Sequence, residues 1–88
     1  MRRAARIDNT ATALVAYAKQ IGFDYVPIND VIDGLLIFGQ VVIIADWKSK
    51  GGELTSAQSR LIARGVPVRF LSKPQQLDAL KVELLRSL

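Results

Sequence analysis

Two aspartates and a lysine near the middle of the sequence have residue types that could bind a divalent cation and activate water. Asp46 and Lys48 end one apolar run, and Asp33 stands just before another. Mg²⁺ and Mn²⁺ prefer oxygen ligands such as carboxylates. A nearby lysine can orient an attacking water or, as the neutral amine, deprotonate it, and its ammonium form can offset charge on a phosphoryl oxygen. The residue types therefore point to metal-assisted hydrolysis, provided that the fold brings them together.

A tight hairpin would bring them together. The two apolar runs are separated only by Gly39-Gln40, which predicts a two-residue loop with glycine first. With this loop Asp33 lies directly opposite Asp46, where two carboxylates repel unless a positive charge lies between them. A divalent cation bound by both carboxylates and by the backbone carbonyl of Trp47 would supply that charge. Lys48 lies on the face of Asp46, because side chains alternate along a strand.

The same residues also allow a purely structural interpretation. Asp33 could cap the preceding turn, Asp46 could pair with Lys48 as a strand-end ion pair, and a bulge would change the register. Gln58 likewise has two interpretations. It follows Thr55 by three residues, which is the spacing of a capping box. Alternatively, from the first turn of a helix, Gln58 could contact a phosphate or a metal-bound water. The residues alone leave these alternatives open.

The pattern around these residues predicts an α/β fold with the order α-β-β-β-α-β-α. Both faces of the hairpin are apolar, so we expect a mixed central sheet with helices on both faces. Pro27 places the first strand at an edge, and Trp47 is expected in the core. The expected elements are helices over 8–20, from 55 to about 64 and from 72 onwards, and strands over 23–28, 33–38, 41–47 and 66–71.

The composition restricts the classes of protein. The chain has 88 residues, 50% of them hydrophobic, which predicts a single domain over 1–88. The absence of cysteine and histidine excludes disulfides, thiol chemistry, a Ser-His-Asp triad and most zinc sites. No apolar run approaches the roughly 18 residues of a membrane span, and no signal-peptide core follows the first residues. We therefore expect a soluble cytoplasmic protein without a membrane partner.

The charge is compatible with a polyanionic partner. The formal net charge is +4, and the pI is about 9.9. Arg2, Arg3 and Arg6 form a basic N-terminal arm within residues 1–7 and are candidates for phosphate contacts. Lys50 and Arg60 are further candidates. There is no recognition helix or zinc module to contact bases specifically, so binding through the backbone or the shape of the nucleic acid is expected.

These motifs resemble the PD-(D/E)XK nuclease superfamily, above all its virus-type replication-repair nuclease (VRR-NUC) domains and similar small phage nucleases. The pattern there is Pro-Asp, an apolar hairpin, Glu-x-Lys, a Gly-containing loop, Leu-Ser/Thr-x-x-Gln, and a helix before a Gly-x-x-Val strand. This chain has Ile32-Asp33, Asp46-Trp47-Lys48, Leu54 to Gln58 and Gly65 to Val68. It departs from the pattern at Ile32, which replaces proline, and at Asp46, where glutamate is commoner.

The resemblance implies a restriction-endonuclease-like core. It makes Asp33 and Asp46 the metal ligands, Lys48 the catalytic lysine and Gln58 a supporting amide. The first helix of such nucleases often adds an acidic residue, for which Asp8 is the candidate here.

The implied activity is a Mg²⁺- or Mn²⁺-dependent DNA endonuclease selective for branched or junction DNA, in a bacterial or phage-infected cell. It needs no nucleotide cofactor. Because 88 residues offer little surface to enclose a duplex, a homodimer is expected. The alternatives are a non-catalytic DNA-binding or assembly module with the same fold, and an RNA-processing enzyme.

Overall fold

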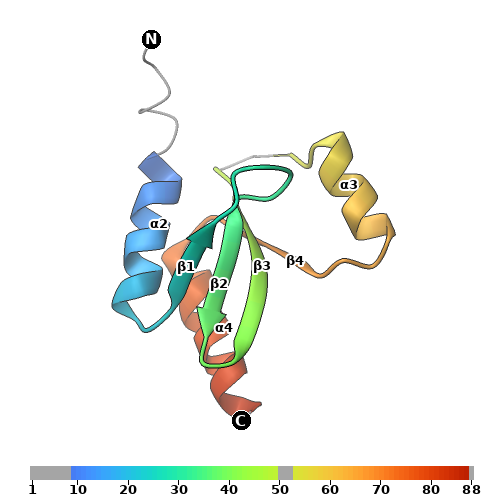
Figure 1. Cartoon of the computed structure of the whole chain (residues 1–88). Helices are drawn as coiled ribbons and strands as arrows, with labels where there is room; N and C mark the ends of the chain where they lie inside the picture. The colour runs from blue at the N-terminus through green and yellow to red at the C-terminus, as the bar shows by residue number, and fades with distance from the viewer. Residues whose placement is uncertain (1–8, 50–52, 88) are drawn as a thin grey trace.

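The computed structural model describes residues 9–49 and 53–87, which form a four-stranded sheet and three helices (Figure 1). The α/β class and the predicted order of elements are confirmed. The elements are α2 (Asn9–Gln20), β1 (Asp24–Pro27), β2 (Gly34–Phe38), β3 (Val41–Trp47), α3 (Ser56–Ala63), β4 (Val68–Leu71) and α4 (Pro74–Arg86).

The sheet is mixed, with the strands in the order β1-β2-β3-β4. The first three strands are antiparallel neighbours, and β4 pairs with β3 in parallel. The β2–β3 hairpin turns at Gly39-Gln40 with Phe38 opposite Val41, so the predicted register is confirmed. Gly39 has φ of 64°, a conformation that favours glycine. β1 is an edge strand, which is where a sheet tolerates Pro27.

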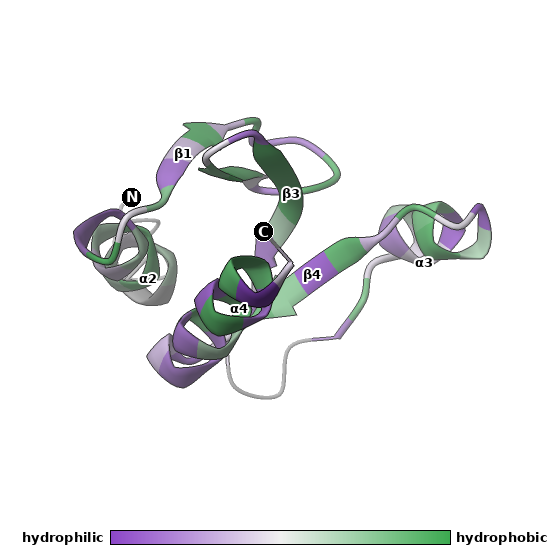
Figure 2. Cartoon of the chain, turned by 90° about the horizontal axis from the view of Figure 1, so that it is seen from below, coloured by the Kyte–Doolittle hydropathy of each residue, from purple (hydrophilic) through white to green (hydrophobic). Residues whose placement is uncertain are grey.

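The hydrophobic core lies between one face of the sheet and the helices α2 and α4 (Figure 2). Trp47 belongs to this core, with 8% of its surface exposed, as predicted. The last helix contributes Leu77, Leu80 and Leu84 at helical spacing, whereas the adjacent Leu85 is exposed. The buried core residues are Leu14, Ala18, Phe23, Leu36, Ile43, Ala45, Trp47, Leu71, Leu77, Leu80 and Leu84.

The second face of the hairpin is covered much less than expected. Val42 is 57% exposed, and Leu35, Ile37 and Ile44 on the same face are only partly buried. The short helix α3 stands to the side of the sheet, beyond the start of β4 (Figures 1 and 2). It meets the hairpin at the end of β3, through Gln58. The prediction of helices on both faces is therefore wrong for most of the hairpin.

Helix α3 begins as the sequence predicts. Thr55 is its N-cap, and the reciprocal hydrogen bonds of a capping box with Gln58 are both present. Gly65 follows the helix with φ of 88°, again a conformation that favours glycine. Among the residues that the structure describes, no helix is both long and apolar enough to span a bilayer.

Candidate active site

Asp33 and Asp46 meet where the β2–β3 ladder ends. The last paired residues are Gly34 and Ala45, one step before the two aspartates. Beyond them, the N–H of Asp33 donates to Asp46 Oδ1 at 3.0 Å, and the N–H of Trp47 donates to Asp33 Oδ2 at 2.7 Å. The hairpin thus brings the two carboxylates together as predicted, and each is fixed by a backbone N–H.

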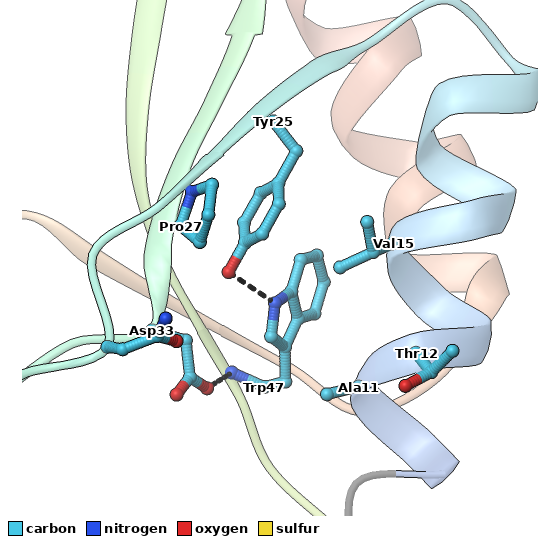
Figure 3. A pocket seen from close by; sticks show the side chains of 8 residues that line it. Ala11, Thr12, Val15, Tyr25, Pro27, Asp33 and Trp47 are labelled. Carbon is cyan, nitrogen blue, oxygen red and sulfur yellow. Dashed lines mark hydrogen bonds between the residues drawn. The ribbon is translucent and has the colours of Figure 1, made fainter.

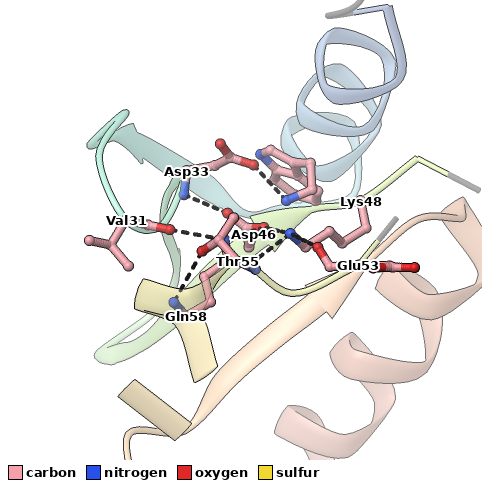
Figure 4. Close-up of polar contacts among 8 residues, drawn as sticks. Val31, Asp33, Asp46, Lys48, Glu53, Thr55 and Gln58 are labelled. Carbon is pink, nitrogen blue, oxygen red and sulfur yellow. Dashed lines mark hydrogen bonds and ion pairs between the residues drawn. The ribbon is translucent and has the colours of Figure 1, made fainter. Parts of the chain in front are cut away.

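Lys48 and Gln58 complete a compact polar cluster around Asp46 (Figure 4). Lys48 Nζ lies 3.1 Å from Asp46 Oδ2 and 2.8 Å from Gln58 Oε1. Gln58 Nε2 donates to the same Asp46 oxygen at 3.1 Å. Asp46 and Gln58 are each only 4% exposed. The strand-end ion pair of the structural interpretation is therefore present, within the same cluster as the predicted site.

The carboxamide of Gln58 has a defined orientation, because each of its ends has several partners. Its Oε1 accepts from the N–H of Thr55 at 3.2 Å and from Lys48, while its Nε2 donates to the carbonyl of Val31 at 3.0 Å and to Asp46. Gln58 is therefore both a helix cap and part of the cluster. The role of the Val31 carbonyl was not predictable, since any residue type supplies such an oxygen.

The ammonium group of Lys48 has three acceptors. Besides Asp46 and Gln58, it donates to the backbone carbonyl of Glu53 at 3.2 Å. A lysine has three N–H donors, so all of them are used in this conformation. To contact a substrate oxygen, Lys48 has to release one acceptor. The bond to Glu53 is the longest of the three and involves a neutral oxygen.

Asp33 is in a less favourable electrostatic position than an exposed aspartate. Partial burial raises its pKa above the ordinary value, and the negative charge of Asp46 raises it further. The hydrogen bond from Trp47 and the charge of Lys48 act in the opposite direction but do not cancel the rise. A bound cation would relieve both the burial cost and the repulsion from Asp46.

The donor set fits a weakly held Mg²⁺ or Mn²⁺. Asp46 already accepts from three donors, so about one of its four acceptor positions is left, whereas Asp33 accepts only from Trp47 among the contacts described. Within residues 9–49 and 53–87, no three Asp, Glu, His or Cys side chains form a metal-binding group. Mg²⁺ is commonly bound by one or two carboxylates, with waters and substrate phosphates completing its shell. Asp33 and Asp46 match that mode.

Of the other predicted site residues, the described part of the chain contains only Arg60 and Trp47. Arg60 is exposed on α3, where it lines a hollow with Arg64 and Val31, and it takes no part in the two ion pairs found among the described residues. The carbonyl of Trp47 remains a predicted ligand. The remaining predicted site residues lie outside the described residues: Arg2, Arg3, Arg6, Asp8 and Lys50.

A slot lies beside the carboxylate of Asp33, between α2 and the ends of β1 and β3 (Figure 3). Its aromatic residues are Tyr25 and Trp47, whose ring centroids are 5.7 Å apart. Trp47 Nε1 donates to Tyr25 Oη at 3.1 Å. No motif in the sequence singles out Tyr25. The alternation of β1 indicates only which face it occupies, and the β1–β2 register that places it here was not predicted.

Comparisons of the chain with models of protein families, with curated proteins and with solved structures find no match. The resemblance to the nucleases therefore rests on sequence motifs alone.

Proposed function

We propose that this protein is a divalent-metal-dependent DNA endonuclease that hydrolyses phosphodiester bonds. The observation that supports this proposal is the buried cluster in which Asp46 contacts Lys48 and Gln58 while the second carboxylate, Asp33, lies beside it. Two negative charges placed together in a partly buried site destabilise a fold unless a positive charge compensates them. A metal-dependent hydrolase accounts for both the carboxylates and the lysine.

Each residue of the cluster has a role in this proposal. Asp33 and Asp46 hold Mg²⁺ or Mn²⁺, which when bound supplies positive charge to stabilise charge developing on the phosphate. Lys48, once it has released Glu53, donates to the attacking water or to a phosphoryl oxygen. Gln58 is a positioning residue, because its Oε1 holds Lys48 and its Nε2 holds Asp46.

The substrate and the assembly are part of the same proposal. DNA is proposed on the basis of the resemblance, and the formal charge of +4 is compatible with a nucleic-acid partner. Branched or junction DNA is the proposed substrate. A homodimer is proposed because a chain of 88 residues cannot surround a duplex alone.

A second candidate is a non-catalytic DNA-binding or assembly module with the same fold. The observation that favours it is that Lys48 and Gln58 already neutralise and hydrogen-bond Asp46. In that case the cluster only holds α3 against the end of the hairpin, and Asp33 has no chemical role.

Cleavage of a labelled DNA panel separates the two candidates. The panel comprises single strand, duplex, flap and four-way junction, with an RNA copy of each sequence, in Mg²⁺, Mn²⁺ or EDTA. The nuclease proposal predicts cutting of DNA in either metal and none in EDTA. If folded protein cuts nothing, the binding module is favoured, and preferential cutting of the RNA copies would make the protein a ribonuclease.

A further inference from the structure

The slot beside Asp33 is large enough for one flat ring. Its volume is about 320 Å³, at the lower end of the range of about 300–1,000 Å³ typical of small-molecule sites. Ala11 and Val15 of α2 form one wall, and Tyr25 and Trp47 face them from the sheet (Figure 3). These walls are aliphatic and aromatic, so they suit a planar group of low polarity better than a phosphate.

The slot depends on Gly34. An ideal Cβ at this position would lie 2.5 Å from Tyr25 Oη and 2.5 Å from the carbonyl oxygen of Val26. Only glycine lets the tyrosine ring lie across β2 and reach Trp47. The position of Tyr25, and with it one wall of the slot, therefore requires this residue type.

Polar groups line the slot from both sides. The Asp33 carboxylate, which belongs to the candidate active site, and the exposed Asn29 line it next to the sheet, and the exposed Thr12 lines it from α2 (Figure 3). Tyr25 Oη accepts from Trp47 Nε1, and a phenol can still donate its own proton while it accepts. The negative charge of Asp33 disfavours an anion in the slot, whereas the carbonyl oxygens and ring nitrogens of a nucleobase could accept from Tyr25.

We propose that this slot receives one unpaired nucleobase of the DNA substrate, next to the phosphate on which Asp33, Asp46 and Lys48 act. The inference rests on the proposed function, and it narrows the substrate to DNA with an unpaired nucleotide at the cleavage site. A base inside a duplex is stacked and paired, so it must leave the helix to enter a side-chain pocket. Aromatic side chains bind unpaired bases by stacking without regard to sequence. Flaps and gaps offer such bases, whereas a fully paired duplex or a fully paired four-way junction does not.

The fluorescence of Trp47 tests this inference directly, because Trp47 is the only tryptophan in the chain. Protein in EDTA is titrated with a DNA hairpin that has an abasic loop and carries a short single-stranded tail, with the same hairpin carrying an abasic tail, and with a blunt hairpin that has the same abasic loop. The tailed hairpin should change Trp47 emission with about tenfold tighter apparent binding than the abasic or blunt forms. Equal responses to all three DNAs, or no response to any, would overturn the inference.

Matched variants test whether the fluorescence change arises from binding in the slot. Ala11→Phe fills it from α2, whereas Ala13→Phe adds the same ring to an exposed position of the same helix that does not line the slot. We expect Ala11→Phe to weaken the response to the tail about tenfold and Ala13→Phe to leave it unchanged. Thr12→Phe, at an exposed position that does line the slot, gives the same test if Ala11→Phe does not fold. An unchanged response in folded slot variants would overturn the inference.

This test is independent of cleavage, because the binding titration contains no metal. A slot-dependent fluorescence change without cutting in Mg²⁺ or Mn²⁺ would refute the nuclease and leave the base-binding slot standing. Cutting of tailed DNA that is equally fast in Ala11→Phe would support the nuclease and refute the slot.

Discussion

Asp33 and Asp46 have the same side chain but different surroundings. Asp46 is almost fully buried and accepts from the backbone of Asp33, from Lys48 and from Gln58. Asp33 is partly exposed and accepts from the backbone of Trp47. Replacing Asp46 by alanine would leave buried donors unpaired at a cost of about 3 kcal/mol, so this variant tests folding more than catalysis. Asp33 is therefore the better position for testing chemistry.

Replacing Asp33 by asparagine should stabilise the protein at neutral pH. The raised pKa of Asp33 means that its carboxyl group binds a proton more tightly in the folded protein than in the unfolded chain. The resulting contribution to stability is fully present below the ordinary pKa of 3.8 and is lost as the pH rises through the raised pKa. The substituted amide would keep an acceptor for Trp47 without the charge, so Asp33→Asn should be more stable above this window and little changed below it. Because solvent screens a partly exposed charge, the gain should not exceed about 0.5 kcal/mol.

Urea denaturation over a pH series measures this difference. Asp30→Asn is the matched control, because Asp30 is an exposed aspartate on the neighbouring loop, and it should follow the wild type. An Asp33→Asn variant that is less stable than the wild type at neutral pH would show that the electrostatic account of this residue is wrong.

Gln58 should contribute more to stability than any surface glutamine. Gln58→Met keeps the length of the side chain but removes the partners of Lys48, Asp46 and the Val31 carbonyl. We expect a loss of about 2–3 kcal/mol in the free energy of unfolding, because buried polar groups are left unpaired. Gln75→Met, at an exposed position of α4, should change stability by less than about 0.5 kcal/mol. Similar unfolding midpoints for the two variants would contradict the proposed importance of the buried cluster.

The elements of the site differ in how far their sequences determine them. The β2–β3 hairpin has strong local signals, since Gly39-Gln40 sets the loop and hence the register that opposes Asp33 and Asp46. The start of α3 is equally local, because the capping box needs only Thr55 and Gln58. The hairpin register was enough to predict that Asp33, Asp46 and Lys48 lie together, whereas the residues alone left the role of Gln58 open between a helix cap and a site residue.

Other features depend on tertiary contacts that no local pattern encodes. The apolar residues Val42 and Ile44 predicted a helix over the second face, but α3 meets the hairpin only at the end of β3, through Gln58. The passage of Tyr25 over Gly34 depends on the β1–β2 register, which the six residues between these strands do not specify by turn chemistry. The slot beside Asp33 was therefore not predicted.

Gly34→Ala should disturb the whole wall of the slot. The added methyl group would overlap Tyr25 and the backbone of Val26, so we expect a loss of about 2–3 kcal/mol and a shift in Trp47 emission. Gly39→Ala is the control, because nothing lies within 4 Å of its added Cβ and only its positive φ, 64°, opposes alanine. It should cost about 1 kcal/mol and leave Trp47 emission unchanged. Unchanged emission in Gly34→Ala would contradict the contact between Tyr25 and Trp47.

At the scale of the whole molecule, the described residues bring only two carboxylates, Asp33 and Asp46, to the proposed metal site. Two carboxylates bind Mg²⁺ or Mn²⁺ weakly, so DNA should complete the metal site with a phosphate oxygen. We expect Mn²⁺ to bind about tenfold or more tightly when DNA is present, and DNA to bind more tightly by the same factor when Mn²⁺ is present. Titration of Mn²⁺ followed by electron paramagnetic resonance, with non-cleavable flap DNA, measures the coupling. Equal Mn²⁺ affinity with and without DNA would exclude a shared site.

The proposal that Asp33 serves catalysis at the expense of stability is tested most directly by the cleavage rate of Asp33→Asn. Wild type, Asp33→Asn and Asp30→Asn are purified in parallel, and their melting temperatures and rates of flap-DNA cleavage in Mn²⁺ are measured on the same samples. We predict that Asp33→Asn melts at or above the wild-type temperature and cuts at least about a hundredfold more slowly, with Asp30→Asn unchanged in both. A folded Asp33→Asn that cuts as fast as the wild type would contradict the proposed active site.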